Sequence, residues 1–296
     1  MDLIYSRKSS IQWLKEMFKS FTIPRALDRL SVRNKLKDYL SVLRSRDEKL
    51  WELHAKLELI RSEMRMNYDS YDYGNGYYYQ SMRRINLSGH RNTEDRIEQL
   101  GLAQRVANKT VLDIGSNSGF LLLSLSQYIK NGIGIEINDY LVSTGLAVKN
   151  YLNITNVELI SGTFEDYPEN NSQFDIILSL ANHCTYDGNT KQSVDSYFRK
   201  IAHLLTDEGQ VIFESHPPEI EPIEKLNQTI CIIEKYFIIE EKPNLNLKGF
   251  LDKNRYYLIA RKNNRVEQIS SIFVASISIS PLLVWGNTIG IVVYFY

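Results

Sequence analysis

The stretch Thr110–Gly119, T-V-L-D-I-G-S-N-S-G, constrains the fold more than any other part of this chain. An apolar run over residues 111–114 leads into a turn of glycine, serine and asparagine, and an apolar helical segment starts at Phe120. A buried strand that ends in a small-residue turn and continues into a helix presents backbone N–H groups to a ligand in α/β proteins. Gly115 permits the tight turn, and Gly119 lets the helix start close to the strand. The stretch therefore predicts a ligand-binding turn at one edge of a sheet.

Two carboxylates belong to the same pattern. Asp113 lies inside the otherwise apolar strand, where a carboxylate is costly unless it has a partner. Glu136 lies near the end of a second short apolar strand over residues 133–137, 21 positions after Gly115. A carboxylate at such a position binds both ribose hydroxyls in nucleotide-type sites. The spacing therefore predicts an adenosine-containing ligand on a doubly wound sheet.

Two common nucleotide motifs do not fit this turn. The nicotinamide fingerprint G-x-G-x-x-G fails because position 117 is Asn, and the G-K-[ST] ending of a P-loop is missing. A glycine-containing turn without a ligand is the alternative interpretation.

Three segments carry a resemblance to a known family. V-L-D-I-G-S-N-S-G-F, G-I-E-I-N and F-D-I-I-L-S-L resemble the class I S-adenosylmethionine-dependent methyltransferases. The resemblance spans roughly residues 70–261. It implies S-adenosylmethionine as cofactor, methyl transfer (EC 2.1.1.-) as activity, and an α/β fold with a Rossmann-like sheet of seven strands. Its motifs are specific for the cofactor and weak for the methyl acceptor.

The pattern from residue 110 onward agrees with that fold. Strands and helices alternate, which predicts a parallel sheet buried on both faces, and a final pair of strands suits an antiparallel edge. The expected strands are residues 111–114, 133–137, 157–160, 174–180, 210–214, 237–241 and 256–261. The expected helices between them are residues 120–130, 139–151, 191–205 and 222–236.

We divide the chain into four regions. They are a helical, coiled-coil-like extension (1–66), a tyrosine-rich lid and helix (67–109), the cofactor-binding domain (110–262) and a hydrophobic tail (263–296). With 35 basic and 35 acidic residues, the balanced charge gives no pull toward nucleic acid or a membrane surface. Two cysteines without a CxxC motif, and no visible signal peptide, favour the cytoplasm.

The N-terminal extension carries a heptad pattern. Leucines recur every seven residues, at Leu36, Leu43, Leu50 and Leu57. This spacing is typical of a coiled-coil seam. Two interpretations stay open, because the run is short: a helix that forms a homodimer or docks a partner, or a helix packed on its own domain.

The second region starts with N-Y-D-S-Y-D-Y-G-N-G-Y-Y-Y-Q, residues 67–80, which indicates a loop. Tyrosine rings with hydroxyls suit contact with sugars, bases or a sulfonium cation, so we expect a lid over the cofactor. A surface loop with interface tyrosines is the alternative. Residues 89–100 read as a helix opened by Asn92 or Thr93. The resemblance implies that Arg91, just ahead of it, binds the methionine carboxylate; the alternative is an exposed cation.

The resemblance also places the cofactor on particular residues. Its amino-acid end requires the turn after the first strand, its ribose requires Glu136, and its adenine requires an apolar neighbour, for which Phe164 is the candidate. In the family that the chain resembles, an acidic residue is common at the position of Thr163. Either Glu165 or Asp166 takes its place, or backbone groups alone contact the adenine. The predicted cofactor-binding residues are Arg91, Asp113, Gly115, Ser116, Asn117, Gly119, Glu136, Asn138, Phe164, Glu165, Ser179 and Leu180.

The catalytic candidates are His183, Glu214 and His216. The fourth and fifth strands end in S-L-A-N-H-C and F-E-S-H-P-P-E, so these residues meet at the edge of the sheet where open α/β sheets bind ligands. His183 is the candidate general base, because a neutral imidazole can take the proton of an acceptor hydroxyl; a structural histidine is the alternative. Glu214 and His216 could orient an acceptor. We expect no metal, because only E-x-H is local.

The acceptor is the least defined part of the prediction. The helical preamble, the tyrosine-rich loop, G-x-R-N-T-E and N-H-x-x-Y-D resemble both surface-polysaccharide-cluster methyltransferases and tRNA mo5U methyltransferase-like proteins. RNA binding predicts a basic stripe, and residues 67–261 contain no such run, which favours polysaccharide biosynthesis: a hydroxyl or phosphate of a glycan or other small or lipid-linked acceptor. A cofactor-binding scaffold without turnover is a third interpretation.

The tail favours membrane contact without requiring it. Residues 269–296 carry no charge and are long enough to cross a bilayer. Pro281, Gly286 and Gly290, with the many isoleucines and valines, suit strands almost as well, and buried, oligomer-forming or disordered structure is the alternative. The basic residues ahead of the tail would keep the catalytic part on the cytoplasmic side, attached to the inner face of the membrane.

Overall fold

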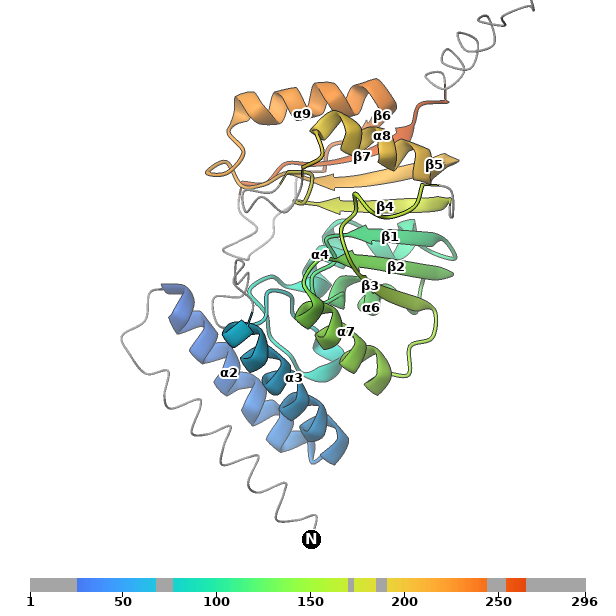
Figure 1. The fold of residues 1–296 in the computed structure, drawn as a ribbon. Coiled ribbons are helices and arrows are strands. Elements are labelled where there is room, and N and C mark those ends of the chain that lie inside the picture. Colours follow the sequence, from blue (N-terminus) through green and yellow to red (C-terminus); the bar gives the residue numbers. More distant parts are fainter. Residues whose placement is uncertain (1–25, 68–76, 170–172, 185–190, 244–253, 265–296) are drawn as a thin grey trace, which may run out of the picture.

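The computed structural model describes residues 26–67, 77–169, 173–184, 191–243 and 254–264. Within them, seven strands form one sheet in the order β3-β2-β1-β4-β5-β7-β6 (Figure 1). The strands are β1 (Thr110–Ile114), β2 (Asn131–Glu136), β3 (Val157–Ser161), β4 (Phe174–Leu180), β5 (Leu205–Glu214), β6 (Phe237–Glu241) and β7 (Tyr257–Lys262). The strands β1 to β5 pair in parallel, whereas β7 runs antiparallel to both β5 and β6. This is the predicted α/β sheet of class I methyltransferases.

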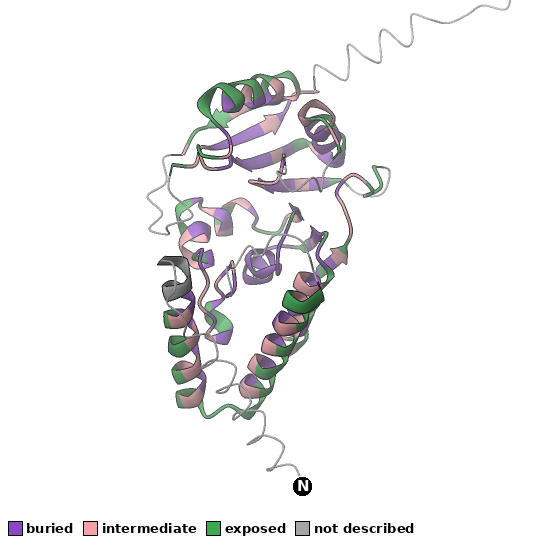
Figure 2. Cartoon of the chain, turned by 60° about the vertical axis from the view of Figure 1, so that its left-hand side comes forward, coloured by how far each residue is buried: buried purple, intermediate pink, exposed green. Residues whose placement is uncertain are grey.

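Helices cover both faces of the sheet. They are α2 (Ala26–Ser45), α3 (Glu48–Asn67), α4 (Thr93–Gln99), α5 (Leu102–Arg105), α6 (Phe120–Leu125), α7 (Asp139–Tyr151), α8 (Val194–Leu204) and α9 (Ile223–Tyr236), with a short 3-10 turn η1 (Arg83–Ile85). Side chains of α3 to α7 pack on one face, and those of α8 and α9 pack on the other. Neighbouring residues of β1 point to opposite faces: Val111 joins the first cluster and Leu112 the second. Both faces of the sheet are buried in Figure 2 as a result.

Local capping signals explain where several helices begin. The side chain of Asn138 accepts hydrogen bonds from the N–H groups of Tyr140 and Leu141 and so starts α7. Asn92 accepts from the N–H of Asp95 and starts α4, as predicted. The predicted ranges 139–151, 174–180 and 237–241 coincide with α7, β4 and β6.

Two boundaries differ from the prediction by five residues. Strand β5 begins at Leu205, five residues earlier than expected, because the chain passes from α8 directly into extended backbone. Helix α6 ends at Leu125 instead of residue 130, and residues 126–130 form the turn that leads into β2. Tertiary pairing decides both ends: Phe174 of β4 pairs with Leu205 ahead of a register shift in the β4–β5 pair.

The heptad leucines do not lie on one helix, and the coiled-coil seam is not supported. Arg46 has a left-handed backbone (φ 55°), and the Asp47 side chain accepts a hydrogen bond from the N–H of Leu50 and caps α3, so the leucine series is split between two helices. Leu50 and Leu57 are buried inside the same domain, where α3 packs against α7. Packing on its own domain is therefore the correct interpretation for α3. A homodimer through α2, whose Leu36 is 47% exposed, stays a prediction.

The predicted lid and tail fall mainly outside this structure. Residues 68–76 of the tyrosine-rich loop and residues 265–296 of the tail are not among the described residues. Within the described ranges, none of the helices has the length and hydropathy needed to cross a bilayer.

Candidate functional site

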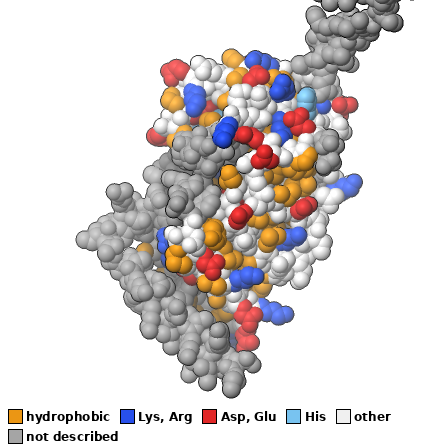
Figure 3. Space-filling view, viewed as in Figure 1, with side chains coloured by type: hydrophobic (Ala, Val, Ile, Leu, Met, Phe, Trp, Pro, Cys, Tyr) orange, Lys and Arg blue, Asp and Glu red, His pale blue; other side chains and the backbone are white. Residues whose placement is uncertain are grey.

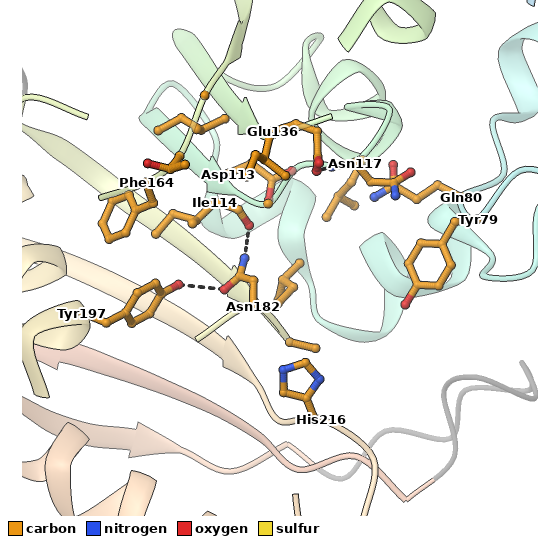
Figure 4. A pocket seen from close by; sticks show the side chains of 18 of the residues that line it. Tyr79, Gln80, Asp113, Ile114, Asn117, Glu136, Phe164, Asn182, Tyr197 and His216 are labelled. Carbon is orange, nitrogen blue, oxygen red and sulfur yellow. Dashed lines mark hydrogen bonds between the residues drawn. The ribbon is translucent and has the colours of Figure 1, made fainter. Parts of the chain in front are cut away.

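A cavity opens at the carboxyl ends of β1, β2 and β4, where the sheet order changes direction from β1 to β2 on one side and to β4 on the other (Figure 4). Such a point is where open α/β sheets bind ligands. The lining residues come from the turn after β1, the ends of β2 and β4, the segments before α4 and after β3 and β5, and from α4, α6 and the start of α8. They are Tyr79, Gln80, Arg91, Arg96, Asp113, Ile114, Gly115, Asn117, Leu121, Ile135, Glu136, Ile137, Gly162, Thr163, Phe164, Glu165, Leu180, Ala181, Asn182, Gln192, Tyr197 and His216.

The turn after β1 needs left-handed backbone at three positions. Gly115, Asn117 and Gly119 have φ values of 63°, 55° and 68°. A Cβ atom on Gly119 would lie 2.7 Å from a methyl carbon of Leu159 and would displace that side chain, and the left-handed backbone favours glycine there. This backbone path brings the start of α6 close to the cavity, as the sequence predicted.

The carboxylate of Glu136 closes the same turn. Its Oε2 accepts a hydrogen bond from the N–H of Asn117 at 2.9 Å, and its Oε1 accepts from the N–H of Asn138 at 3.1 Å. The side chain is 8% exposed and lines the cavity. The two backbone donors fix the carboxylate at the end of β2, which is the position predicted for binding a ribose.

A second carboxyl group, that of Asp113, is buried in the cavity wall at 2% exposure. Burial raises its pKa to about 7; Arg96 opposes the rise and Glu136 adds to it. Its Oδ2 makes no hydrogen bond with any described residue. A buried carboxyl oxygen without a partner is costly in a native protein, so a cationic or hydrogen-donating ligand group suits this position.

Arginines surround the next part of the wall. Arg91 and Arg96 line the cavity and are 1% and 3% exposed. Both form ion pairs with Glu214, Arg91 at 2.8 Å, and Arg255 joins the same carboxylate at 2.9 Å. The guanidinium of Arg91 also lies over the Tyr79 ring, 5.7 Å from its centroid. Three cations around one anion leave a surplus of positive charge beside Asp113.

Glu214 is therefore not where the sequence-based interpretation put it. We expected it beside the two histidines, but its fully buried side chain faces the arginines and is not part of the cavity lining. Burial opposes ionisation of Glu214, but Arg91, Arg96 and Arg255 outweigh it and lower its pKa to about 2. Its observed contacts hold the arginines in position.

The far end of the cavity has an aromatic wall. Phe164 packs edge-on against Tyr197, with ring centroids 5.2 Å apart, and the Lys200 ammonium lies 5.1 Å from the Phe164 ring centre. Glu165 accepts hydrogen bonds from the N–H groups of residues 191 and 192 at 2.6 and 2.8 Å. Thr163 donates its hydroxyl to Asp166 at 2.6 Å. Thr163 and Glu165 line the cavity and Asp166 does not.

A neutral hydrogen-bond network connects β4 with α8. The Asn182 side chain donates from Nδ2 to the carbonyl of Ile114 and accepts from the Tyr197 hydroxyl at 2.7 Å (Figure 4). Ser179 also donates to Asn182, at 3.1 Å. The network fixes Asn182 and Tyr197 in the cavity wall. Ser179 does not line the cavity, because its side chain is fully buried.

The two histidines lie next to each other near this wall. The ring centroids of His183 and His216 are 5.3 Å apart, and Nε2 of His183 bonds Oε1 of Glu221 at 2.9 Å. His216 lines the cavity and donates from Nε2 to the carbonyl of Cys184 at 2.7 Å. Burial would raise the pKa of the Cys184 thiol, but hydrogen bonds from both histidines outweigh it and lower that pKa to about 6. His183 is 1% exposed and is not part of the cavity lining.

Most of the predicted cofactor residues meet at this cavity. Eight of them line it: Arg91, Asp113, Gly115, Asn117, Glu136, Phe164, Glu165 and Leu180. Four support the wall from behind: Ser116, Gly119, Asn138 and Ser179. Sequence reasoning did not name Arg96, Asn182 and Tyr197, whereas Tyr79 and Gln80 lie in the segment predicted as a lid. N-H-x-x-Y-D pointed to the neighbourhood of Asn182, but no local signal marked Arg96 or Tyr197, which reach the cavity from α4 and α8.

The arrangement fits S-adenosylmethionine. Arg91 and Arg96 supply cations that suit a carboxylate, and the Asp113 oxygen that makes no hydrogen bond suits an ammonium group. Glu136 and Phe164, the predicted neighbours of the ribose and the adenine, both line the cavity. The groups in the wall are thus those that an adenosyl amino acid requires.

Comparison with known proteins agrees. A family model described as "Methyltransferase domain" matches residues 105–264, so the chain belongs to the S-adenosylmethionine-dependent methyltransferases of class I. The chain is 28% identical over 130 residues to the uncharacterized methyltransferase YcgJ of Bacillus subtilis, a match that covers 43% of this chain and 49% of YcgJ. The chain thus spans about half the length of the curated relative it matches.

Two solved structures are similar in fold. One is the N-methyltransferase NodS from Bradyrhizobium japonicum in complex with S-adenosyl-L-homocysteine, at 13% identity, with 57% of this chain and 87% of that chain covered and a TM-score of 0.46. The other is a SAM-dependent methyltransferase from Aquifex aeolicus, at 17% identity, with 58% and 90% covered and a TM-score of 0.46. Likeness at this level says nothing about the acceptor.

Proposed function

We propose that this chain transfers the methyl group of S-adenosylmethionine to a hydroxyl group, or a phosphate, of a glycan or of another small or lipid-linked acceptor. The observation that carries the proposal is the cavity itself. It combines an arginine and aspartate end for an amino acid, an oriented carboxylate for a ribose, and a neutral polar wall beyond them. In the reaction the acceptor oxygen bonds to the methyl carbon in line as the carbon–sulfur bond breaks, and the electron pair of that bond stays on sulfur. A hydroxyl acceptor gives up its proton to solvent in the same reaction.

The neutral wall supports a hydroxyl-bearing acceptor. Asn182 and His216 lie on the opposite side of the drawn cavity from Glu136 in Figure 4. With Tyr79 and Tyr197 they offer hydroxyl, amide and imidazole groups, which hydrogen-bond sugars without demanding a charge. Tyr79 belongs to the segment that the sequence predicts as a lid, and its side chain lines the cavity.

Surface charge favours a glycan over RNA. On the face drawn in Figure 3, lysines and arginines are interspersed with aspartates and glutamates. An RNA-binding enzyme is expected to gather basic side chains along the path of the phosphate backbone. The arginines nearest the cavity are engaged by Glu214, which leaves them suited to one carboxylate rather than to a polyanion.

The proposal is tested by following the labelled methyl group. The purified chain is incubated with methyl-tritiated S-adenosylmethionine and, separately, a pool of glycans, a pool of lipid-linked saccharides, and bulk tRNA. We expect label in a saccharide pool, with an equal amount of S-adenosylhomocysteine released. Label in tRNA would contradict the glycan proposal, and cofactor binding without any transfer would favour the scaffold interpretation.

A further inference from the structure

The cluster of His183, Cys184 and His216 has the composition of a metal site. One ring nitrogen from each histidine and the Cys184 sulfur lie within 4.8 Å of one another. They come from two separate segments, the end of β4 and the residues after β5, which neighbour each other in the sheet. The sequence-based expectation of no metal considered Glu214, His216 and His183, and the structure places Cys184 beside the two histidines in place of Glu214.

The Nδ1 atom of His183 is the observation that points to a ligand. His183 is 1% exposed, and its Nδ1 makes no hydrogen bond to nitrogen or oxygen in the described part of the chain. Its other nitrogen, Nε2, bonds the carboxylate of Glu221 at 2.9 Å. That bond orients the ring so that Nδ1 faces the Cys184 thiol, where a metal ion would replace the proton that the two groups share. Carboxylate–histidine pairs of this kind orient the histidine ligands of metal sites.

The position of Glu221 is itself well determined. Its Oε1 also accepts from the Thr229 hydroxyl at 3.0 Å, and its Oε2 accepts from the N–H of His216 at 3.0 Å. One buried carboxylate thus ties both histidines together from the far side of the cluster. The His216 ring is held in addition by its hydrogen bond to the Cys184 carbonyl.

We propose that His183, Cys184 and His216 bind one zinc ion, which lies at the edge of the cavity that His216 lines. Thiolate and imidazole together favour zinc among the common divalent ions. Zinc bonds of about 2.0 to 2.3 Å in a tetrahedron hold ligand atoms about 3.3 to 3.6 Å apart, a distance that small side-chain shifts reach from the observed arrangement. Three protein ligands with one open position are typical of catalytic zinc sites, whereas structural sites use four.

The fourth ligand that we expect is a heteroatom of the methyl acceptor. Only this part of the inference rests on the proposed function; the zinc site stands on the geometry of the cluster alone. His216 belongs both to the cluster and to the neutral wall of the cavity. An ion held there would orient an acceptor oxygen toward the methyl group.

Metal content tests the site directly. Untagged full-length protein is dialysed against zinc sulfate, freed of unbound metal on a desalting column and analysed for zinc. We expect about one zinc per chain, and a loss to background in Cys184→Ser, whose side chain is only half-buried. The matched control is Cys231→Ser, which changes the exposed cysteine of α9 and should keep the zinc. Zinc at background in the wild type, or equal zinc in wild type and Cys184→Ser, would overturn the proposal.

Cobalt substitution reports the ligands and the open position. Cobalt chloride added to the metal-free wild type should give a thiolate-to-cobalt charge-transfer band in the near ultraviolet, absent in Cys184→Ser. Glu221→Gln should weaken metal affinity by roughly 10- to 100-fold, as loss of such a supporting carboxylate does elsewhere. Sodium azide should shift the visible cobalt bands if the fourth position is open; unchanged bands would contradict an acceptor ligand.

A parallel measurement separates this inference from the proposed function. Binding of S-adenosylhomocysteine is measured on the same samples by calorimetry. Zinc binding without S-adenosylhomocysteine binding would refute the proposed function and support the metal site. S-adenosylhomocysteine binding without zinc would refute the metal site and leave the proposed function in place.

Discussion

Replacing Glu136 by alanine tests the ribose assignment, on which the orientation of the whole cofactor depends. The carboxylate is held at the end of β2 by the N–H groups of Asn117 and Asn138. A ribose presents two hydroxyl donors to it. A hydrogen bond to a charged group contributes about 1.5 kcal/mol or more, so two of them contribute about 3 kcal/mol. We therefore expect Glu136→Ala to raise the dissociation constant for S-adenosylhomocysteine roughly 100-fold.

The measurement is calorimetric titration with S-adenosylhomocysteine, which binds without turnover. The variant also removes an acceptor from two backbone N–H groups, so circular dichroism and thermal unfolding must show that the protein is folded at the titration temperature. Glu158→Ala is the matched control, because Glu158 lies exposed on the neighbouring strand β3. A folded Glu136→Ala variant with a dissociation constant within about threefold of the wild type would refute the reasoning, as would an equal loss in Glu158→Ala.

Three further predictions follow from the same site. Asp113, with its pKa raised to about 7, must ionise to pair with the ligand's ammonium, so S-adenosylhomocysteine affinity should fall about tenfold per pH unit below 7, and Asp113→Asn should remove this dependence in calorimetry. Glu214→Gln should lower the free energy of unfolding by about 3 to 5 kcal/mol at neutral pH. Because the pKa of Glu214 falls from 4.5 to about 2 on folding, its stabilisation is complete above about pH 4.5 and is lost toward pH 2, so urea titrations of the two proteins should converge there; a constant difference would contradict this. Gly145→Ala places a Cβ 2.5 Å from the Ser118 carbonyl oxygen and should destabilise the protein by about 1 to 3 kcal/mol, although alanine ordinarily favours a helix; an unchanged or raised melting temperature would contradict the packing.

Local signals made the fold predictable. Alternating apolar segments set the strands, and asparagines at 92 and 138 mark helix starts because their side chains bond nearby N–H groups. The turn after β1 was equally readable, since left-handed backbone selects glycine and asparagine. The spacing from Gly115 to Glu136 was also a usable signal, because one strand–helix–strand unit of ordinary length brings the two residues together.

The heptad pattern shows the limit of such signals. Leucines spaced by seven are compatible with one long helix or with two helices that pack on a domain. The left-handed residue Arg46 and the cap at Asp47 settle the choice in favour of two. The distinction depends on what covers the leucines, and α7 does so for α3 from about 90 residues further along the chain.

The sequence alone determined the sheet, the cofactor class and the cavity-lining positions after β1 and β2, because each depends on residues within one strand–turn–helix unit. Tertiary structure alone decided which charged groups meet. It turned Glu214 toward three arginines, brought Arg96 and Tyr197 to the cavity, and joined Glu221 and Cys184 to the two histidines. These pairings link residues up to 123 positions apart, as Arg91 and Glu214 are, and burial selects them because an unpaired charge inside a protein is too costly to persist.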